Sequence, residues 1–101
     1  MRSMNRRPTL PGEILSEHFL GERGVPIGRF AEETGLHRKT VSAVLHGRAR
    51  ITAETAVRFS RVLDTTPEFW LNLQRDWDLW HSLQKHRKVP SLRRQIAPRP
   101  A

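Results

Sequence analysis

Cysteine is absent from this 101-residue chain, which excludes disulfides and thiolate chemistry and favours a reducing compartment. Long apolar runs are absent too. No stretch approaches the length that spans a bilayer, and the basic N-terminal stretch lacks the apolar segment of a signal peptide. Strand-like alternation and internal repeats are also missing. We therefore expect one all-α domain that is soluble and cytoplasmic and does not contact a membrane.

Motifs for catalysis or cofactor binding are missing as well. The five histidines show no metal-ligand spacing, and no glycine-rich phosphate loop occurs. Ser42 and His46 are one helical turn apart, but no buried carboxylate is expected to orient the histidine. The neighbouring acids Asp76 and Asp78 are most simply explained as solvated. We therefore expect no enzyme activity, no metal site and no cofactor.

The net charge of +8 at pH 7 indicates an anionic partner, but most of it lies in the two tails. Residues 1–10 hold three arginines and no acid, and residues 85–101 hold six cations and no acid. Residues 11–84 carry nine basic and ten acidic residues, and six of the cations lie between Arg38 and Arg61 against Glu54 alone. The folded part is thus predicted to be slightly acidic with one basic band, which is either a binding surface or an ordinary solvated face.

The apolar spacing predicts five helices joined by short turns. They form a folded unit over residues 11–86, between a flexible N-terminal arm at 1–10 and a flexible basic tail at 87–101. The expected helices are PGEILSEHFL from Pro11, IGRFAEETG from Ile27, residues 38–46, TAETAVRFSRVL capped by Thr52, and PEFWLNLQRDWDLWHSLQ from Pro67.

End signals support these helices. Pro11 suits a first helical position, where its missing N–H is not needed, and Gly21 and Gly24 are expected to close the first helix. Thr52 and Thr66 are expected to cap the fourth and fifth helices through their hydroxyl oxygens.

The second and third helices show the pattern of a helix-turn-helix, although a generic helical hairpin with a glycine turn is the alternative. Gly35 can adopt the left-handed conformation of the turn, and Ala31 is small where the helices would cross. The spacing of Val41, Val44 and Leu45 predicts that they anchor the third helix to the core. The opposite arc has no bulky apolar group, which suits entry into a DNA major groove. That arc holds Arg38, Lys39, Thr40, Ser42, Ala43 and His46.

The fifth helix is apolar on two sides. A small core cannot bury both sides, so we predict that part of this helix contacts a second copy of the chain. The alternatives are that every apolar residue is core, or that the tryptophans stack on bases, against which Asp76 and Asp78 argue. The predicted interface comprises Trp70, Leu73, Trp77 and Trp80 on one side and Leu71, Leu79 and Leu83 on the other.

The stretches PGEIL, GLHRKTVSAVLHGRARIT and TTPEFWLNLQRDWDL resemble the Xre/Cro-type (lambda-repressor-like) helix-turn-helix family, and within it the HigA/VapI-type antitoxins. The resemblance covers residues 11–80. It implies base contacts by Arg38, Lys39 and Ala43, and phosphate contacts by Thr40, Arg48 and Arg50. We add the outward-facing His37, Ser42 and His46 to the predicted phosphate contacts. The chain departs from the family pattern at Ile27, where relatives often have Gln, and at His37, where they usually have a Ser or Thr cap.

The resemblance implies a DNA-binding antitoxin. Such a protein binds a palindromic operator in double-stranded DNA as a homodimer, represses its own operon and neutralises a HigB/RelE-like ribonuclease toxin. We expect an acidic flank at Glu13, Glu17 and Glu22 to face the toxin, because toxins of that type are basic. A stand-alone Xre-type repressor and an RNA- or ribosome-associated basic protein are the alternatives.

Overall fold

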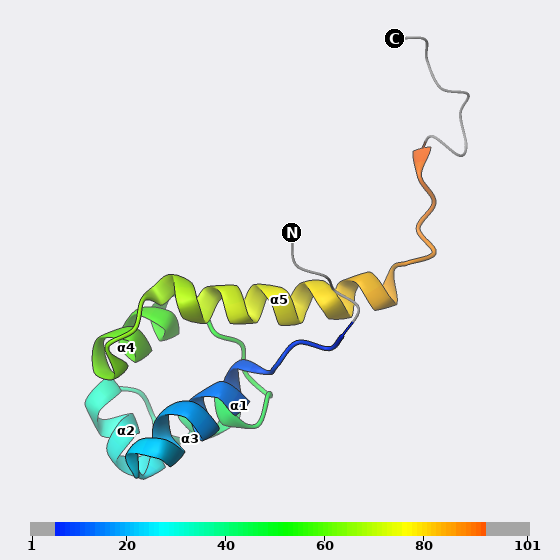
Figure 1. Cartoon of the computed structure of the whole chain (residues 1–101). Coiled ribbons are helices and arrows are strands. Elements are labelled where there is room, and N and C mark those ends of the chain that lie inside the picture. The colour runs from blue at the N-terminus through cyan, green and yellow to red at the C-terminus, as the bar shows by residue number, and fades with distance from the viewer. Residues whose placement is uncertain (1–5, 93–101) are drawn as a thin grey trace.

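The computed structural model describes residues 6–92, and within that range it contains helices joined by short turns and no strand (Figure 1). This confirms the predicted all-α fold. The parts of the predicted arm and tail at 1–5 and 93–101 lie outside the described residues. The elements are α1 (Pro11–Ile14), which continues directly into the π-helical stretch η1 (Leu15–Gly21), then α2 (Ile27–Thr34), α3 (Arg38–Leu45), α4 (Ala53–Leu63) and α5 (Pro67–Lys85).

The first helical rod, α1 with η1, extends beyond the predicted stretch. Gly21 and Gly24 were both expected to close it; the helical conformation continues through Gly21 to Arg23, and Gly24, at a φ of 64°, ends it. Residues five apart share a face in a π-helical turn, and Leu15 and Leu20 are both buried.

The turn between α2 and α3 forms as predicted. Gly35 adopts the left-handed conformation with a φ of 75°, and its N–H donates to the carbonyl oxygen of Ala31 at 3.0 Å. Ala31 is buried where α2 packs into the core. Arg58 of α4 adds a hydrogen bond that was not foreseen, because its guanidinium donates to the carbonyl oxygen of Thr34 at 2.9 Å. The end of α2 is therefore fixed both by its own glycine and by α4.

Two threonine hydroxyls begin α4 and α5, as predicted. Thr52 Oγ1 accepts the N–H of Thr55 at 3.2 Å, and Thr66 Oγ1 accepts the N–H of Phe69 at 3.1 Å. Each such cap is worth about 1 kcal/mol of stability. These caps set where the two C-terminal helices start.

The core centres on Trp70, which is fully buried. Its ring centroid lies 5.3 Å from that of Phe59 and 5.4 Å from that of Phe19, and its indole N–H donates to Thr65 Oγ1 at 2.8 Å. Phe30 continues the cluster, at 5.1 Å from Phe59. The prediction that Trp70 belongs to a dimer interface is therefore wrong, because a side chain with no exposed surface cannot contact a second copy of the chain.

The segment 6–10 is not helical, but it is packed against the folded unit rather than free. The guanidinium carbon of Arg7 lies 5.1 Å from the ring centroid of Trp77, and its Nη2 lies 3.5 Å from Glu13 Oε1. Leu10 is half-buried. A cation–π contact and an ion pair thus hold this part of the predicted arm along the domain.

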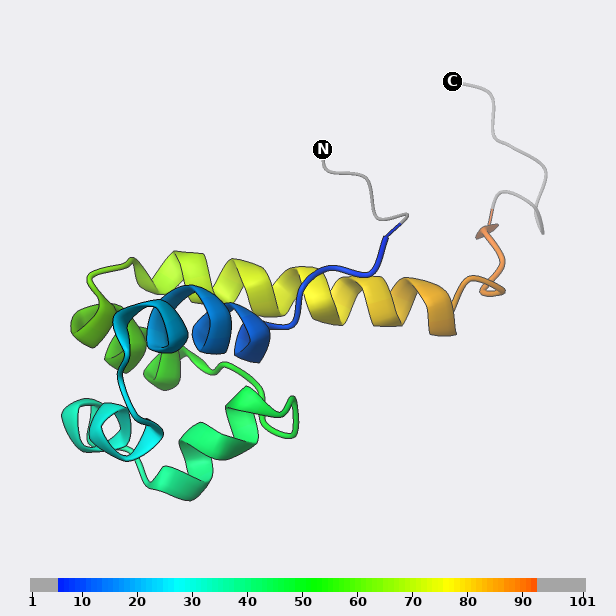
Figure 2. The ribbon, with the colours of Figure 1, turned by 60° about the horizontal axis from the view of Figure 1, so that its bottom comes forward.

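The helices form a bundle from which the second half of α5 extends (Figures 1 and 2). In Figure 2, α3 forms the lower edge of the molecule and α5 lies on the opposite side. Across residues 6–92, no helix combines the length and the apolar character needed to cross a membrane.

Candidate nucleic-acid interface

The helix α3 is seated on the core by the side predicted for it. Val41 and Val44 are buried and Leu45 is half-buried, as their spacing indicated. A second support comes from α1, where Gly12 lies against the last turn of α3. A Cβ on Gly12 would be 2.3 Å from the carbonyl oxygen of Val44 and 2.5 Å from that of Leu45. Only glycine permits this approach of two backbones. Sequence reasoning missed it, although Gly12 lies within the PGEIL stretch.

The opposite side of α3 faces outward with the residues predicted to contact DNA. Arg38, Lys39 and His46 are exposed, and Thr40, Ser42 and Ala43 are half-buried. His46 folds back on its own helix, with Nδ1 2.8 Å from the carbonyl oxygen of Ser42. A carbonyl only accepts, so Nδ1 carries a proton and a neutral ring would have an accepting Nε2. Nδ1 is thus engaged within α3, and a phosphate contact by His46 would use Nε2.

The first turn of α3 has no side-chain cap. His37 occupies the cap position with extended backbone angles, and its side chain makes no capping hydrogen bond. The expected departure from a Ser or Thr cap is thus seen in the structure. His37 and the exposed Arg38 and Lys39 border a hollow at this end of the helix, together with Thr40.

The loop after α3 folds back onto the helix and carries two arginines. Gly47 has a φ of 73°, and the N–H groups of Arg48 and Ala49 both donate to the carbonyl oxygen of Ala43, at 2.8 and 3.1 Å. Arg48 is exposed, and it borders a hollow together with Trp77 and Asp78 of α5. Its phosphate contact stays a prediction.

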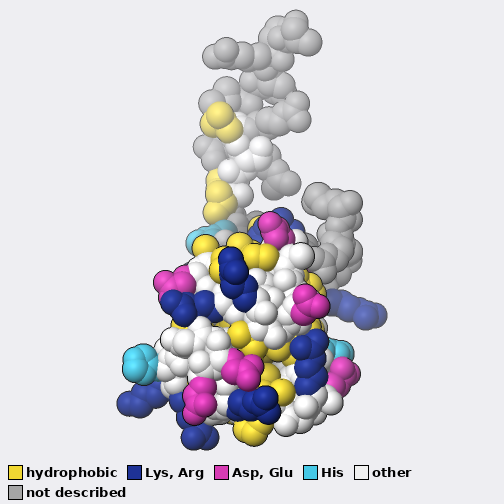
Figure 3. Space-filling view, turned by 90° about the vertical axis from the view of Figure 1, so that its left-hand side faces the viewer, with side chains coloured by type: hydrophobic (Ala, Val, Ile, Leu, Met, Phe, Trp, Pro, Cys, Tyr) yellow, Lys and Arg dark blue, Asp and Glu magenta, His cyan; other side chains and the backbone are white. Residues whose placement is uncertain are grey.

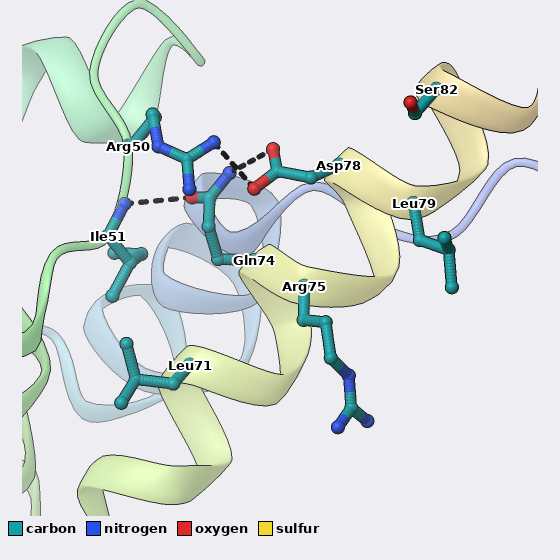
Figure 4. A pocket seen from close by; sticks show the side chains of 8 residues that line it. All are labelled: Arg50, Ile51, Leu71, Gln74, Arg75, Asp78, Leu79 and Ser82. Carbon is teal, nitrogen blue, oxygen red and sulfur yellow. Dashed lines mark hydrogen bonds and ion pairs between the residues drawn. The ribbon is translucent and has the colours of Figure 1, made fainter. Parts of the chain in front are cut away.

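Arg50 lies differently, because its guanidinium is directed to α5 and forms an ion pair with Asp78 (Figure 4). Gln74, one turn earlier on α5, donates from Nε2 to Asp78 Oδ1 at 3.0 Å and accepts the N–H of Ile51 at 2.8 Å. The expectation that Asp76 and Asp78 are simply solvated is wrong. Asp76 is buried, and Asp78 is held between an amide and a guanidinium. Asp78 and Gln74 escaped sequence reasoning because their partners are more than twenty residues away in the chain.

The remaining cations of the predicted basic band, Arg58 and Arg61, lie on α4. On the end of the molecule formed by α2 and α4, basic and acidic side chains alternate (Figure 3). Arg58 pairs with Glu54 at 3.2 Å, whereas Arg61 is exposed. Outside the band, Arg29 pairs with Glu33 at 3.3 Å.

The two apolar sides of α5 have different surroundings. Trp77 is half-buried beneath Arg7, and its ring centroid lies 4.4 Å from that of His81. Leu79 and Leu83, in contrast, are 46% and 47% exposed. Trp80, Leu71 and Leu73 are half-buried, and the two leucines pack against the core.

The leucine side of α5, which carries Leu71, Leu79 and Leu83, borders a groove of about 400 Å³ (Figure 4). Its apolar part is formed by Ile51, Leu71 and Leu79, and Arg75 and Ser82 are among its polar neighbours. The structure thus leaves the leucine side of α5 open and covers much of the tryptophan side. Elsewhere among residues 6–92, no group of three His, Cys, Asp or Glu side chains is arranged to hold a metal ion.

Comparison with known proteins agrees with this geometry. Residues 19–70 match the helix-turn-helix family HTH_3. The chain is 49% identical over 77 residues to an uncharacterized HTH-type transcriptional regulator of Haemophilus influenzae, covering 76% of this chain and 72% of that protein. It is 40% identical over 88 residues to antitoxin HigA-1 of Vibrio cholerae, covering 87% and 83%. The structure of antitoxin GraA in complex with its operator superposes with a TM-score of 0.79 at 38% identity, covering 100% and 99%. The chain therefore belongs to the Xre-like helix-turn-helix family, a family of DNA-binding regulators and not of enzymes, alongside the HigA-type antitoxins.

Proposed function

We propose that this chain is an antitoxin that binds its own operator as a homodimer and neutralises a HigB/RelE-like toxin. One observation carries the DNA half of this proposal. The helix α3 is fixed on one side by Val41 and Val44 and presents an exposed Arg38 and Lys39 on the other. A short cationic helix without bulky outward groups fits a major groove. Such a protein acts in the cytoplasm, where the operator is.

The proposed contacts divide into two kinds. Base edges are contacted by Arg38 and Lys39, whose donors suit guanine, and by Ala43, whose methyl group suits thymine. The phosphate backbone is contacted from the flanks of this face, which positions the helix without reading sequence. The proposed phosphate contacts are His37, Thr40, Ser42, His46 and Arg48. Arg50 is left out of this set because its guanidinium is held by Asp78.

The proposed dimer uses the leucine side of α5. Leu79 and Leu83 are exposed there, and Leu71 lines the adjoining groove. A two-fold axis along this side would bring the same apolar patch of each copy together. Since α3 lies on the opposite side of the molecule from α5, each copy would direct its recognition helix away from the interface (Figure 2). Two such helices read half-sites about 34 Å apart, one turn of DNA.

The proposed toxin surface is the acidic flank of the first helical rod. Glu17 and Glu22 are exposed, and Glu13 is half-exposed beside Arg7. Glu13 and Glu17 line a hollow that His46 of α3 also borders. The relation to antitoxin HigA-1 supports a toxin partner, and the acidic flank suits a basic one.

A mobility-shift assay on the DNA upstream of this gene, with and without the product of the adjacent gene, tests the proposal. The variant Arg38→Ala/Lys39→Ala should lose specific binding. The control Arg87→Ala/Lys88→Ala removes the same charge from exposed positions beyond α5 and should keep it. The opposite pattern would favour an RNA- or ribosome-associated protein that acts through its tail.

A growth assay separates an antitoxin from a stand-alone repressor. Expression of the adjacent gene product alone should arrest growth, and co-expression of this chain should restore it. If the chain binds its upstream DNA but restores no growth and forms no complex with that product, it is a repressor without a toxin partner.

A further inference from the structure

A pair of polar side chains on α5 holds the loop that follows the recognition helix. Gln74 and Asp78 are four residues apart and lie on one face of α5. Gln74 Oε1 accepts the backbone N–H of Ile51, and Asp78 forms an ion pair with the side chain of Arg50. Two consecutive loop residues are thus attached to two consecutive turns of the same helix, as Figure 4 shows. We name these four residues the α5 clamp.

The α5 clamp has a buried side, at Gln74 and Ile51, and an exposed side, where the side chain of Arg50 is 66% exposed. Gln74 is 6% exposed and Ile51 is 2% exposed, so their hydrogen bond is shielded from water. Gln74 also donates to Asp78 Oδ1, which fixes the carboxylate that meets Arg50. Loss of the glutamine amide would leave a buried backbone N–H without a partner, which is a costly state for a folded chain.

The direction of the Arg50 side chain argues against a phosphate contact. Its guanidinium is turned to α5 and is paired there with a half-buried carboxylate. If Arg50 moved to a phosphate, Asp78 would lose its cationic partner next to a DNA backbone that repels it. Arg48, two residues earlier, is exposed; it borders the same hollow as Asp78, but the Asp78 carboxylate is paired with Arg50.

We propose that Gln74 and Asp78 are positioning residues of the DNA interface. They hold the 47–51 loop, and through it Arg48 and the end of α3, in the binding geometry. Arg50 acts through Asp78 and not by contacting phosphate. This inference rests on the proposed operator binding. The α5 clamp borders the groove of the proposed dimer interface, so a second copy that docks there would shield it further.

Salt-dependent binding to the upstream DNA tests the role of Arg50. Arg50→Gln and Asp78→Asn should each weaken DNA binding by about 5- to 10-fold. The double variant should bind about as well as the single variants, because each substitution breaks the same ion pair. The slope of log K against log salt should stay at the wild-type value. Arg48→Gln, the matched control, should lower that slope by roughly 0.9 per subunit because it removes a phosphate contact. If Arg50→Gln lowers the slope as Arg48→Gln does, or if Asp78→Asn leaves binding unchanged or tightens it, the inference is wrong.

A charge exchange gives a second readout that a general loss of stability would not reproduce. Arg50→Glu alone should weaken binding strongly, because it places two acids together. Adding Asp78→Arg should restore binding to within a few-fold of wild type if position 50 faces α5. Binding that stays as weak as in Arg50→Glu, with thermal unfolding unchanged, would overturn the inference. Failure of the wild-type chain to bind its upstream DNA would instead refute the proposed function itself.

Discussion

The substitution Gly12→Ala tests whether α1 fixes the position of the recognition helix. Gly12 is buried where α1 meets the last turn of α3. The added methyl group would lie 2.3 Å from the carbonyl oxygen of Val44, and 2.5 and 2.8 Å from the carbonyl oxygen and carbon of Leu45. All three are backbone atoms, so no side chain can rotate away to make room. The helices themselves must separate.

The size of the effect follows from these distances. Carbon atoms pack best at about 3.5–4.0 Å, so α3 has to move by about 1 Å relative to α1. Overpacking of a well-packed core costs about 1–3 kcal/mol, and a clash with two carbonyl groups belongs at the upper end. For a domain of this size each kcal/mol lowers Tm by about 4–8 °C. We expect Gly12→Ala to lower Tm by about 12 °C or more, and to weaken operator binding because α3 is displaced.

The matched control is Gly28→Ala in α2. An alanine Cβ at Gly28 would have no atom within 4 Å, and the residue does not have a positive φ. The same chemical change should therefore be neutral or stabilising by roughly 0.5 kcal/mol, because alanine is the better helix former. Thermal unfolding followed by circular dichroism measures both. If Gly12→Ala is as stable as Gly28→Ala and binds DNA equally well, the close approach of α1 and α3 does not exist in solution.

Three further predictions concern other parts of the molecule. His37→Ser should stabilise the fold by about 1 kcal/mol in urea titration, because it supplies the side-chain cap that α3 lacks, and an unchanged midpoint would contradict this. Arg48→Ala should lower the salt slope of operator binding by roughly 0.9 per subunit, whereas a loss of affinity at constant slope would exclude a phosphate contact. Leu79→Glu should shift the chain from dimer to monomer in sedimentation, and Leu92→Glu, which changes a leucine that is exposed outside α5, should not; equal behaviour of the two would remove the leucine side from the interface.

Local signals in the sequence were enough to predict where the helices lie and which side of α3 faces the core. Gly35 and the Thr52 and Thr66 caps act on backbone groups within a few residues, so their effect can be judged without the rest of the fold. The spacing of Val41 and Val44 likewise fixes which side of α3 is buried, since helical geometry determines it. These elements agree with the structure for that reason.

The features that were missed depend on partners far away in the chain. Trp70 and Trp77 lie on the same face of α5 by helical spacing, yet of these two only Trp70 packs in the aromatic cluster around Phe59. Asp78 looked like a solvated acid because nothing local distinguishes it from one, and its partner Arg50 lies 28 residues earlier. Of the two glycines expected to close the first helix, only Gly24 does so, because the π-helical turn carries the chain past Gly21, a geometry that a spacing of 3.6 residues does not anticipate.

The recognition helix is supported from outside the helix-turn-helix unit as well as from within it. Gly12 and the α5 clamp residues Gln74 and Asp78 determine how α3 and its loop sit on the domain, yet all three lie outside residues 19–70, the part that matches the family. Within the matched part, α2 packs against α3, and Val41 and Val44 anchor α3 to the core. In the proposed binding mode, the N-terminal and C-terminal helices therefore do more than complete a core, because they help to set the geometry with which the basic face meets DNA. Because α5 also carries the open leucine side, a change at the proposed dimer interface has a short physical route to the loop that bears Arg48. Two contacts make this connection: Gln74 accepts the N–H of Ile51, and Asp78 pairs with Arg50.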